Sequence, residues 1–348
     1  MKKILMCGSA RTEKGGINSV IDQLMNHKWD DNLEFSYLAT HKSGNNITKI
    51  LFFINAYKQL KRLIKKNSFD IIHIHMSYNG SFYRKYYVAK LCKKNNKKII
   101  IHLHGSEFKD FYNFGNRRRK NMIVELFSIA DCTIVLGHDW EKFIKSIALS
   151  ANVKVVNNAV KLPEYKDRIR HDKCTFLFLG ALIKRKGVID LLEALKKINM
   201  HSYKLVIAGA GEEEALLKQF CEKNNMNNCV EFLGWIDNNY KPKLFEKVDV
   251  MVLPSYNEGL PIAILEALSF GLPIISTDVG SIKEAVENKK NGFLFRPGDI
   301  VALKESLEIL INDIDLWKSF SISSRRIAEE KFSENRFFEC IEKIYLTI

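Results

Sequence analysis

The sequence lacks the features that mark a secreted, metal-binding or membrane-spanning protein. Its seven cysteines are scattered along 348 residues and show no C-x-x-C spacing, which argues against structural disulfides and a zinc site. The apolar runs Ile50–Tyr57 and Lys98–Leu103 are far shorter than the roughly 18 residues of a membrane helix. The basic N-terminus continues into only a short apolar run before Gly8. We therefore expect a reduced cytosolic protein that opens on a β-strand and carries no secretion signal.

Acidic residues are scarce in the first half of the chain. Residues 1–165 contain 28 Lys/Arg and 13 Asp/Glu, a net charge of +15, whereas residues 166–348 contain 26 and 27, a net charge of −1, giving +14 in all. Solubility alone can account for such an excess. The functional alternatives are nucleic acid, an anionic membrane face, or an anionic substrate bound by the first half.

The length and the apolar pattern predict two α/β domains. Short apolar runs alternate with amphipathic stretches, a rhythm typical of parallel sheets covered by helices on both faces. We expect doubly wound domains at residues 1–165 and 166–331, with a terminal helix at about 332–348 completing the first and Leu162–Lys173 as the linker. The expected strands are Lys3–Gly8, Leu33–Ala39, Phe69–Met76, Lys98–His104, Cys132–Leu136, Val153–Asn157, Cys174–Gly180, Lys204–Ala208, Val230–Leu233, Asp249–Leu253 and Pro273–Ser276, and the expected helices include Asn46–Lys66, Phe82–Lys94, Val188–Ile198 and Glu212–Asn224.

Two glutamates eight positions apart, Glu258 and Glu266, follow one of these strands. Pro261 suits the first turn of a helix that runs to about Phe270, so the amides of Gly259, Leu260 and Ile262 point out of its start and suit anions or sugar oxygens. Glu266 lies among apolar residues, and a buried carboxylate needs partners. A ribose diol is one candidate partner. A structural ion pair or a solvent-facing glutamate is the alternative.

The segment Glu258–Glu266 resembles the E-x7-E signature of the retaining GT-B glycosyltransferases of glycosyltransferase family 4. The resemblance extends over Phe178–Leu195, Leu205–Glu214, Val230–Asp237 and Thr277–Asp299. It implies the GT-B fold, in which two doubly wound Rossmann-like domains face a cleft, and it implies that Glu258 contacts the transferred sugar and Glu266 the nucleotide ribose. The donor-binding residues that it implies are Gly16, Arg185, Lys186, Gly209, Trp235, Glu258, Gly259, Leu260, Pro261, Ile262 and Glu266.

The leaving diphosphate needs fixed positive charge, and the stretch "GALIKRKG" (Gly180–Gly187) offers it. Lys186 matches the lysine of the family pattern G-R-L-x-x-x-K-G. Ala181 stands in place of the arginine, so Arg185 or Lys184 is a candidate substitute. Three basic residues in a turn are otherwise often only solvated.

In the first domain the family pattern H-x-H-G places His104 beside the reacting sugar and makes it catalytic together with Glu258 and Lys186. His102 is expected to pack behind His104, and His73 and His75 form a second pair. A metal bound by His102 and His104 is conceivable, but no third ligand is apparent beside that pair, and the resemblance implies that no metal is needed. The loop before Gly15 and Gly16 lacks G-x-G-x-x-G, which counts against a dinucleotide oxidoreductase. The acceptor-binding candidates are Gly15, Ser77, Tyr78, Asn79 and His104.

Two further expectations concern helices. The segment Arg325–Ile348 reads as one terminal helix that returns to the first domain, with Phe332, Phe337, Phe338 and Tyr345 packing inside. Basic stretches at Lys58–Asn67, Arg84–Lys98 and Arg117–Lys120 are interleaved with the aromatic residues Phe52, Phe53, Tyr57, Tyr86 and Tyr87, a pattern suited to an anionic lipid surface.

The resemblance therefore implies a retaining, metal-independent hexosyltransferase that needs no cofactor. It moves a sugar from a nucleotide diphosphate sugar, with UDP favoured, to a glycan or polyprenyl-diphosphate-linked acceptor in bacterial surface polysaccharide (O-antigen, capsule or exopolysaccharide) synthesis, peripheral at the cytoplasmic face of the inner membrane. A GT-B nucleotide-sugar 2-epimerase shares the architecture and remains an alternative. A basic nucleic-acid-binding protein is the alternative from another class, although no reading motif is present.

Overall fold

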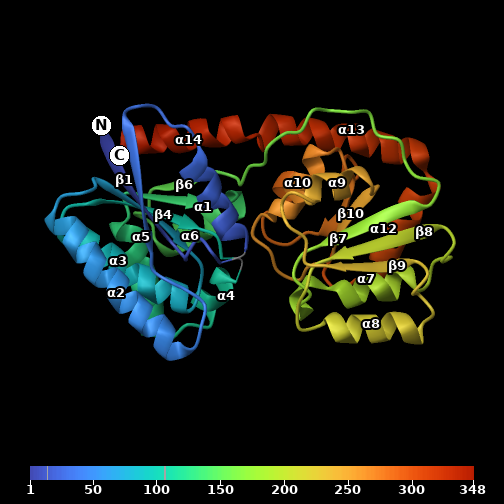
Figure 1. Cartoon of the computed structure of the whole chain (residues 1–348), viewed down its shortest axis with the longest axis horizontal. Helices are drawn as coiled ribbons and strands as arrows, with labels where there is room; N and C mark the ends of the chain where they lie inside the picture. The colour runs from blue at the N-terminus through green and yellow to red at the C-terminus, as the bar shows by residue number, and fades with distance from the viewer. Residues whose placement is uncertain (14, 106) are drawn as a thin grey trace. The chain divides into compact units, whose positions relative to one another are not determined.

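The computed structural model describes residues 1–13, 15–105 and 107–348, and the chain divides into two compact units (Figure 1). The first unit comprises Met1–Asn157 with Phe337–Ile348, and the second comprises Asn158–Arg336. The first boundary lies before the expected 165/166 because the chain joins the second unit at once: Asn158 Nδ2 donates to the Leu260 carbonyl at 2.9 Å, and the Val160 amide to that of Phe332 at 2.9 Å.

Six parallel strands among the described residues form the sheet of the first unit, in the order β2-β1-β3-β4-β5-β6. Isoleucine, valine and leucine fill β3 and β4 almost continuously, which is typical of parallel strands buried on both faces. The strands are β1 (Lys2–Gly8), β2 (Leu33–Ala39), β3 (Ile71–Met76), β4 (Lys98–Leu103), β5 (Cys132–Val135) and β6 (Val153–Val155).

The helices of the first unit divide between the two faces of this sheet. On one face, Leu5, Ile72 and Ile101 pack in a core that also takes residues from α2, α3, α5 and α6. The opposite face carries Met6 and His73 and is covered by α14, which contributes Tyr345. The helices are α1 (Gly16–Asn26), α2 (Asn46–Lys65), α3 (Gly80–Lys94), α4 (Phe108–Asn113), α5 (Arg117–Ile129), α6 (His138–Ile147) and α14 (Glu334–Thr347).

The sheet of the second unit has the order β12-β11-β10-β7-β8-β9, again with all strands parallel. Its strands are β7 (Cys174–Leu179), β8 (Tyr203–Ala208), β9 (Val230–Gly234), β10 (Val250–Leu253), β11 (Ile274–Thr277) and β12 (Gly292–Phe295). Its helices are α7 (Val188–Leu195), α8 (Glu214–Lys223), α9 (Lys241–Glu246), α10 (Ile262–Ser269), α11 (Ile282–Ala285), α12 (Ile300–Asn312) and α13 (Ile314–Lys331), with a 3₁₀ turn η1 at Lys184–Lys186.

The terminal segment Arg325–Ile348 is two helices and not the single helix expected. α13 ends at Lys331 and α14 begins at Glu334, and between them Phe332 takes a non-helical conformation and is buried. Phe337, Phe338 and Tyr345 are also buried, so the packing role expected for this aromatic set is confirmed.

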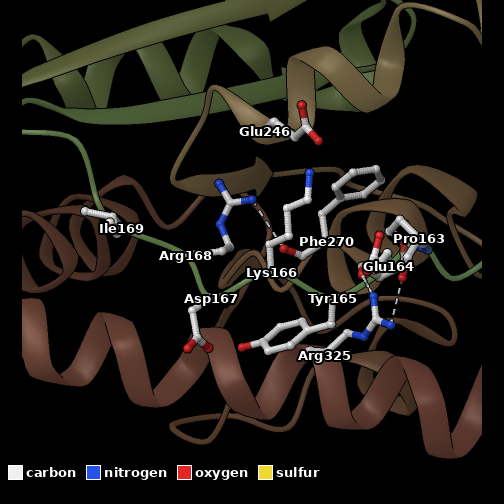
Figure 2. Close-up of a pocket in the computed structure, with 11 residues that line it drawn as sticks. Pro163, Glu164, Tyr165, Lys166, Asp167, Arg168, Ile169, Glu246, Phe270 and Arg325 are labelled. Carbon is white, nitrogen blue, oxygen red and sulfur yellow. Dashed lines mark hydrogen bonds between the residues drawn. The ribbon is translucent and has the colours of Figure 1, made fainter.

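The segment Leu162–Lys173, expected as an interdomain linker, packs on the second unit and lines a cavity of about 380 Å³ (Figure 2). Arg168 donates to the carbonyls of Phe245 and Phe270 at 3.1 and 3.3 Å, and Arg325 donates to that of Pro163 at 2.9 Å. Arg168 also binds the carbonyl of Val248, just before β10, so the cavity lies at the amino end of that strand. It is therefore at the opposite edge of the sheet from Glu258.

All seven cysteines are unpaired, as expected, and Cys340 alone among them is exposed. Over the described parts of the chain, no helix combines the length and the apolar character that crossing a membrane requires.

Candidate active site

Two loops meet at the carboxyl edge of the second sheet, where the strand order reverses between β7 and β10. Open parallel sheets bind ligands at such a switch point. The loop after β7 contains η1 and Lys186, and the loop after β10 contains Glu258. The strand order thus brings together two residues that are 72 positions apart in sequence.

Lys186 and Glu258 form an ion pair in which Nζ lies 2.5 Å from Oε1. Their side chains are only 13% and 8% exposed. Paired charges at low exposure hold one another in place, because either alone pays a desolvation penalty. The resemblance assigned Lys186 to a phosphate and Glu258 to the transferred sugar, and the structure brings these two side chains into contact.

Glycines allow the loops around this pair to approach closely. Gly187 has a left-handed backbone (φ 67°), and a Cβ there lies 2.2 Å from the carbonyl oxygen of Pro254. A Cβ on Gly280 (φ 59°) lies 2.0 Å from the carbonyl oxygen of Glu258. Any larger residue at either position pushes the Glu258 loop away.

Arg185 holds the turn that carries Glu258. Its Nη1 donates to the Asn257 carbonyl at 2.9 Å, and its own carbonyl accepts from the Tyr256 amide at 2.7 Å. Lys184 is exposed, and Ala181 is half-buried. The guanidinium of Arg185 is therefore engaged with the loop backbone in this structure.

The start of α10 lies next to the ion pair. Pro261 is the residue before the helix, with φ −66°, and Ile262 is the first helical residue, so Pro261 stands one position outside the turn expected for it. The amides of Gly259 and Leu260 donate to no group within the described residues. Unsatisfied amides at a helix start attract anions and sugar oxygens.

Glu266, on α10, pairs with Lys241, on α9. Lys241 Nζ lies 2.8 and 3.0 Å from the two carboxylate oxygens, and the side chains are 21% and 23% exposed. Burial raises the pKa of Glu266, and Lys241 opposes that rise. The structure thus supplies the ion pair that the sequence left open as the alternative to a ribose.

The remaining donor-side candidates surround the same edge of the sheet. Trp235 follows β9 and is 54% exposed. Gly209 follows β8, and its amide donates to the Gly234 carbonyl at 2.8 Å. A Cβ on Gly209 lies 1.8 Å from the Gly180 carbonyl oxygen, so the ends of β7 and β8 touch there.

The acceptor-side candidates lie in the first unit, where loops follow β1, β3 and β4. Gly15 precedes α1, and the first residue of that helix is Gly16, which was expected to bind the donor although it also lies in the first unit. A Cβ on Gly105 lies 3.1 Å from Cα of Ser77, so the segment Ser77–Asn79 abuts the loop that follows His104. Asn79 has a positive φ of 51° and precedes α3.

His104 belongs to a stack of four imidazoles on adjacent strands. His73 and His75 come from β3, and His102 and His104 come from β4 and the residue after it. Ring centroids are 4.6 Å apart for His73 and His75 and 4.1 Å for His102 and His104. His102 is fully buried behind His104, as expected, and His104 is half-buried.

The hydrogen bonds of the stack determine which nitrogen of His104 carries the proton. His75 Nε2 lies 2.9 Å from the Met6 sulfur, which only accepts, so His75 Nδ1 is left without a proton. That atom lies 2.9 Å from His104 Nε2, which must donate. His104 therefore presents Nδ1 as an acceptor. Burial lowers the pKa of His104 to about 3, so its ring is neutral near pH 7.

The sequence showed no third metal ligand here, and the structure corrects that view. His73, His75 and His102 offer nitrogens within 4.8 Å of one another. His73 already bonds Tyr345 Oη at 2.6 Å and His102 Nδ1 at 3.2 Å. His102 Nε2 has no partner within the described residues. A metal at this place would have to displace the bonds of His73.

Sequence reasoning missed Lys241, Asn158, Met6 and Tyr345 as parts of these sites. Lys241 and Pro242 open a short helix, and nothing in their own pattern indicates the carboxylate of Glu266. Met6 and Tyr345 read as core residues, and their contacts with His75 and His73 join distant segments. Side chains alternate between the two faces along a strand, which assigns Met6 to one face of β1 but does not identify the residue that it contacts.

Two protein-family models match the chain. The model "Glycosyltransferase Family 4" matches residues 27–163, and the model "Glycosyl transferases group 1" matches residues 164–327. The chain is 28% identical over 365 residues to an uncharacterised 41.2 kDa protein in the cps region of Klebsiella pneumoniae, covering 97% of this chain and 98% of that protein. It is 28% identical over 298 residues to an uncharacterised glycosyltransferase of Haemophilus influenzae, covering 84% and 80%.

Solved structures share the fold over the whole chain. Sucrose-phosphate synthase from Thermosynechococcus elongatus has a TM-score of 0.82 at 17% identity, covering 100% of this chain and 99% of that one. Anabaena HepE, solved with UDP, has a TM-score of 0.80 at 17% identity, with both chains fully covered. The lipopolysaccharide outer core galactosyltransferase WaaB has a TM-score of 0.73 at 21% identity, covering 99% and 100%. With this GT-B fold and with both family models matched in order, the chain belongs to glycosyltransferase family 4.

Proposed function

We propose that this glycosyltransferase moves a sugar, with retention at the anomeric carbon, from a UDP-sugar to a hydroxyl of a lipid-linked glycan. The observation that carries the proposal is the Lys186–Glu258 pair at the switch point of the second sheet. It combines a cation for a leaving diphosphate with a carboxylate for sugar hydroxyls in one place.

The geometry of the site supports the following roles. Lys186 and the amides of Gly259 and Leu260 stabilise the departing diphosphate, Glu258 orients the sugar, and Glu266 accepts from the ribose hydroxyls in place of Lys241. The bond from the anomeric carbon to the β-phosphate oxygen breaks as the bond to the acceptor oxygen forms on the same face. The acceptor proton passes to the departing phosphate, so no enzyme base is consumed.

We also propose that the reaction needs no metal, because protein cations and amides meet the diphosphate charge. UDP is favoured because the HepE structure of the same fold contains UDP. Surface polysaccharide synthesis is supported by the relative in a cps region and by the likeness to the lipopolysaccharide galactosyltransferase. The +15 charge of residues 1–165 supports an acceptor carried at the cytoplasmic face of the inner membrane.

A thermal-shift screen against UDP, GDP, ADP and their sugars tests the donor. Ligand at a hundredfold over its dissociation constant stabilises the folded chain by about 2.7 kcal/mol. We expect UDP and a UDP-sugar to raise the melting temperature of the wild type more than that of Glu266→Ala. Equal shifts in the two proteins contradict the ribose role, and no shift with any nucleotide contradicts the donor site.

Product analysis distinguishes transfer from the 2-epimerase alternative. An epimerase converts the nucleotide sugar without an acceptor, whereas a transferase releases the nucleoside diphosphate. Proton NMR of the new linkage then reads the anomeric configuration, and an inverted product contradicts retention.

A further inference from the structure

The helix α2 carries an apolar stripe on its outer side that no part of the described structure covers. Ile47, Ile50, Leu51 and Ile54 are 70%, 59%, 56% and 42% exposed. Their spacing of i, i+3, i+4 and i+7 places them on one face of the helix. The inner face is separate: Ala56 and Leu60 are buried, and Phe53, Leu63 and Ile64 pack against the core.

The same outer face becomes cationic along the helix. Stepping by four and three residues from Ile47 through Leu51 and Ile54 leads to Lys58, Lys61 and Lys65, all exposed. Arg62 lies beside them, and α2 contains no Asp or Glu. Among the described residues, none of these four cations takes part in an ion pair, so their charge is uncompensated.

The neighbouring helix α3 also presents exposed apolar residues followed by basic ones. Tyr83 and Tyr87 are 37% and 47% exposed, and Lys90 and Lys94 follow on the same face at the same spacing. α2 and α3 lie side by side on one face of the sheet, and both cross over from one parallel strand to the next, so they run in the same direction (Figure 1). Their apolar halves are therefore adjacent, and so are their basic halves.

The structure corrects the residues expected to contact lipid. Phe53 and Tyr86 pack in the core, Phe52 and Tyr57 are half-buried, and only Tyr87 of that aromatic set is exposed. Arg119 stacks on Phe111, with its guanidinium carbon 4.5 Å from the ring centroid, and donates to the Phe111 carbonyl at 3.1 Å. The exposed apolar residues of α2 are therefore aliphatic and not the aromatic residues expected. Arg119 packs on Phe111 and is not available to a lipid surface.

We propose that the outer face of α2, from Ile47 to Lys65 together with Tyr83 and Tyr87 of α3, is a docking surface for an anionic lipid leaflet. Ile47, Ile50, Leu51 and Ile54 enter the boundary between headgroups and acyl chains, and the lysines contact lipid phosphates. This inference rests on the proposed lipid-linked acceptor and names the element that holds the enzyme at the membrane.

Charge favours a lipid surface over a second copy of the chain. In a parallel pairing of two α2 helices, Lys58, Lys61 and Lys65 would face their own counterparts. In an antiparallel pairing, the aliphatic half would meet the lysine half. Neither arrangement covers both halves, whereas an anionic leaflet provides an apolar layer beside a negative one.

Flotation of the full-length protein with phosphatidylglycerol/phosphatidylethanolamine vesicles and with phosphatidylcholine vesicles tests the surface. We expect binding to the anionic vesicles only, with Ile50→Ser/Ile54→Ser lowering the bound-to-free ratio about tenfold because aliphatic insertion is lost. The matched control, Ile314→Ser/Ile322→Ser, alters two aliphatic residues of the second unit that are each 53% exposed, and it should bind like the wild type.

A second pair of variants tests the cations. Lys58→Glu/Lys61→Glu/Lys65→Glu should abolish flotation, whereas the control Lys173→Glu/Lys197→Glu/Lys223→Glu, of equal charge change, should retain most of it. Binding by the wild type should also weaken in about 0.5 M salt, where screening shortens the range of the charges.

Insertion is measured directly with Leu51→Trp and brominated lipids. Quenching of this tryptophan beyond that of Ile314→Trp supports the docking surface. Equal quenching of the two tryptophans overturns it, and so does equal recovery of the wild type on both vesicle types. Equal loss of binding by both lysine variants also overturns it, as does a dimer in light scattering that depends on Ile50 and Ile54. Vesicle binding that does not change in Ile50→Ser/Ile54→Ser but is abolished by random DNA also overturns it, in favour of a nucleic-acid surface. The UDP-induced thermal shift is measured on every variant, so loss of docking with that shift intact leaves the proposed donor site standing.

Discussion

Nζ of Lys186 and Oε1 of Glu258 lie 2.5 Å apart, although the two residues follow different strands of the second sheet. Each charge is the other's partner while no ligand is bound, and a diphosphate would compete with Glu258 for Lys186. The pair therefore links donor binding to the position of the sugar-binding carboxylate.

Removing both members of this pair should destabilise the fold less than the two single removals added together. We expect Lys186→Ala and Glu258→Ala each to lower the free energy of unfolding by about 1–3 kcal/mol, because each leaves a poorly solvated charge unpaired. The double variant should lose less than the sum of the two. Urea unfolding in a double-mutant cycle measures this, and additive losses show that the two groups do not interact.

Replacing Lys186 should lower kcat by a larger factor than it lowers the affinity for the donor. Removal of one preorganised donor to a developing negative charge typically costs about 10²–10³ in kcat, so we expect Lys186→Ala to lower kcat at least on this scale. Initial rates of UDP release against UDP-sugar concentration measure kcat and KM. A normal kcat with a raised KM places Lys186 in binding alone.

Glu266→Ala should weaken binding of the nucleotide sugar, since the variant loses the proposed acceptor for the ribose hydroxyls. Hydrogen bonds to a charged group contribute about 1.5–3 kcal/mol, which corresponds to roughly 10- to 150-fold in affinity. Calorimetry compares this variant with Glu246→Ala, an exposed glutamate in the same unit. Unchanged affinity in Glu266→Ala with an intact fold means that Lys241 is the lasting partner.

Activity should persist in EDTA if protein groups alone meet the diphosphate charge. Rates measured after overnight dialysis against EDTA, with and without added Mg²⁺ or Mn²⁺, test this. A rate that disappears on dialysis and returns with a divalent cation shows that the phosphate site has been assigned wrongly.

The histidine stack should make the first unit sensitive to acid. Burial lowers the pKa of His73 to about 3, far below the value of about 6.5 in an unfolded chain. The unfolded state therefore binds more protons between these values, and stability is lost as pH falls below 6.5. Each such histidine contributes up to about 1.4 kcal/mol per pH unit, or about 2 kcal/mol at pH 5.

Urea unfolding at about pH 7.5, 6.5 and 5.5 measures the free energy of unfolding at each pH. Steps on the order of one pH unit are enough to resolve that slope. The slope should be shallower in His73→Asn, which keeps a polar group opposite Tyr345. It should be unchanged in His201→Gln, because His201 is exposed. If the free energy of unfolding depends on pH identically in all three proteins, the histidine stack is not the source of that dependence.

Local pattern was enough to predict most strands and several helices of this fold. β2 was expected at Leu33–Ala39 and is found there, and α2 ends one residue before its expected limit, Lys66. β12 was missed because "GFLF" is short and lies between polar turns, where sheet pairing with β11 and not propensity makes it a strand.

The sites could be predicted only where sequence and topology agree. The neighbourhood of Lys186 and Glu258 follows from two loops at one switch point, which a strand count can place. The pairing of Glu266 with Lys241 joins α10 to α9, and the contacts of Met6 and Tyr345 with the histidines join opposite ends of the chain. Those contacts depend on tertiary packing, which a local pattern does not encode.

The first unit is closed by residues from both ends of the chain. Lys2 Nζ donates to the carbonyls of Tyr345 and Leu346 at 3.1 and 3.0 Å, while Tyr345 bonds the buried His73. During synthesis, β1 and β3 are therefore made long before the helix that covers them. Until α14 is synthesised, the sheet face that carries Met6 and the imidazoles lacks this helix. The first unit therefore cannot complete its fold before the second unit has been made. A released chain that ends at Arg336, and so lacks residues 337–348, should accordingly hold a protease-resistant second unit and a protease-sensitive first one, the reverse of the usual N-terminal-first order.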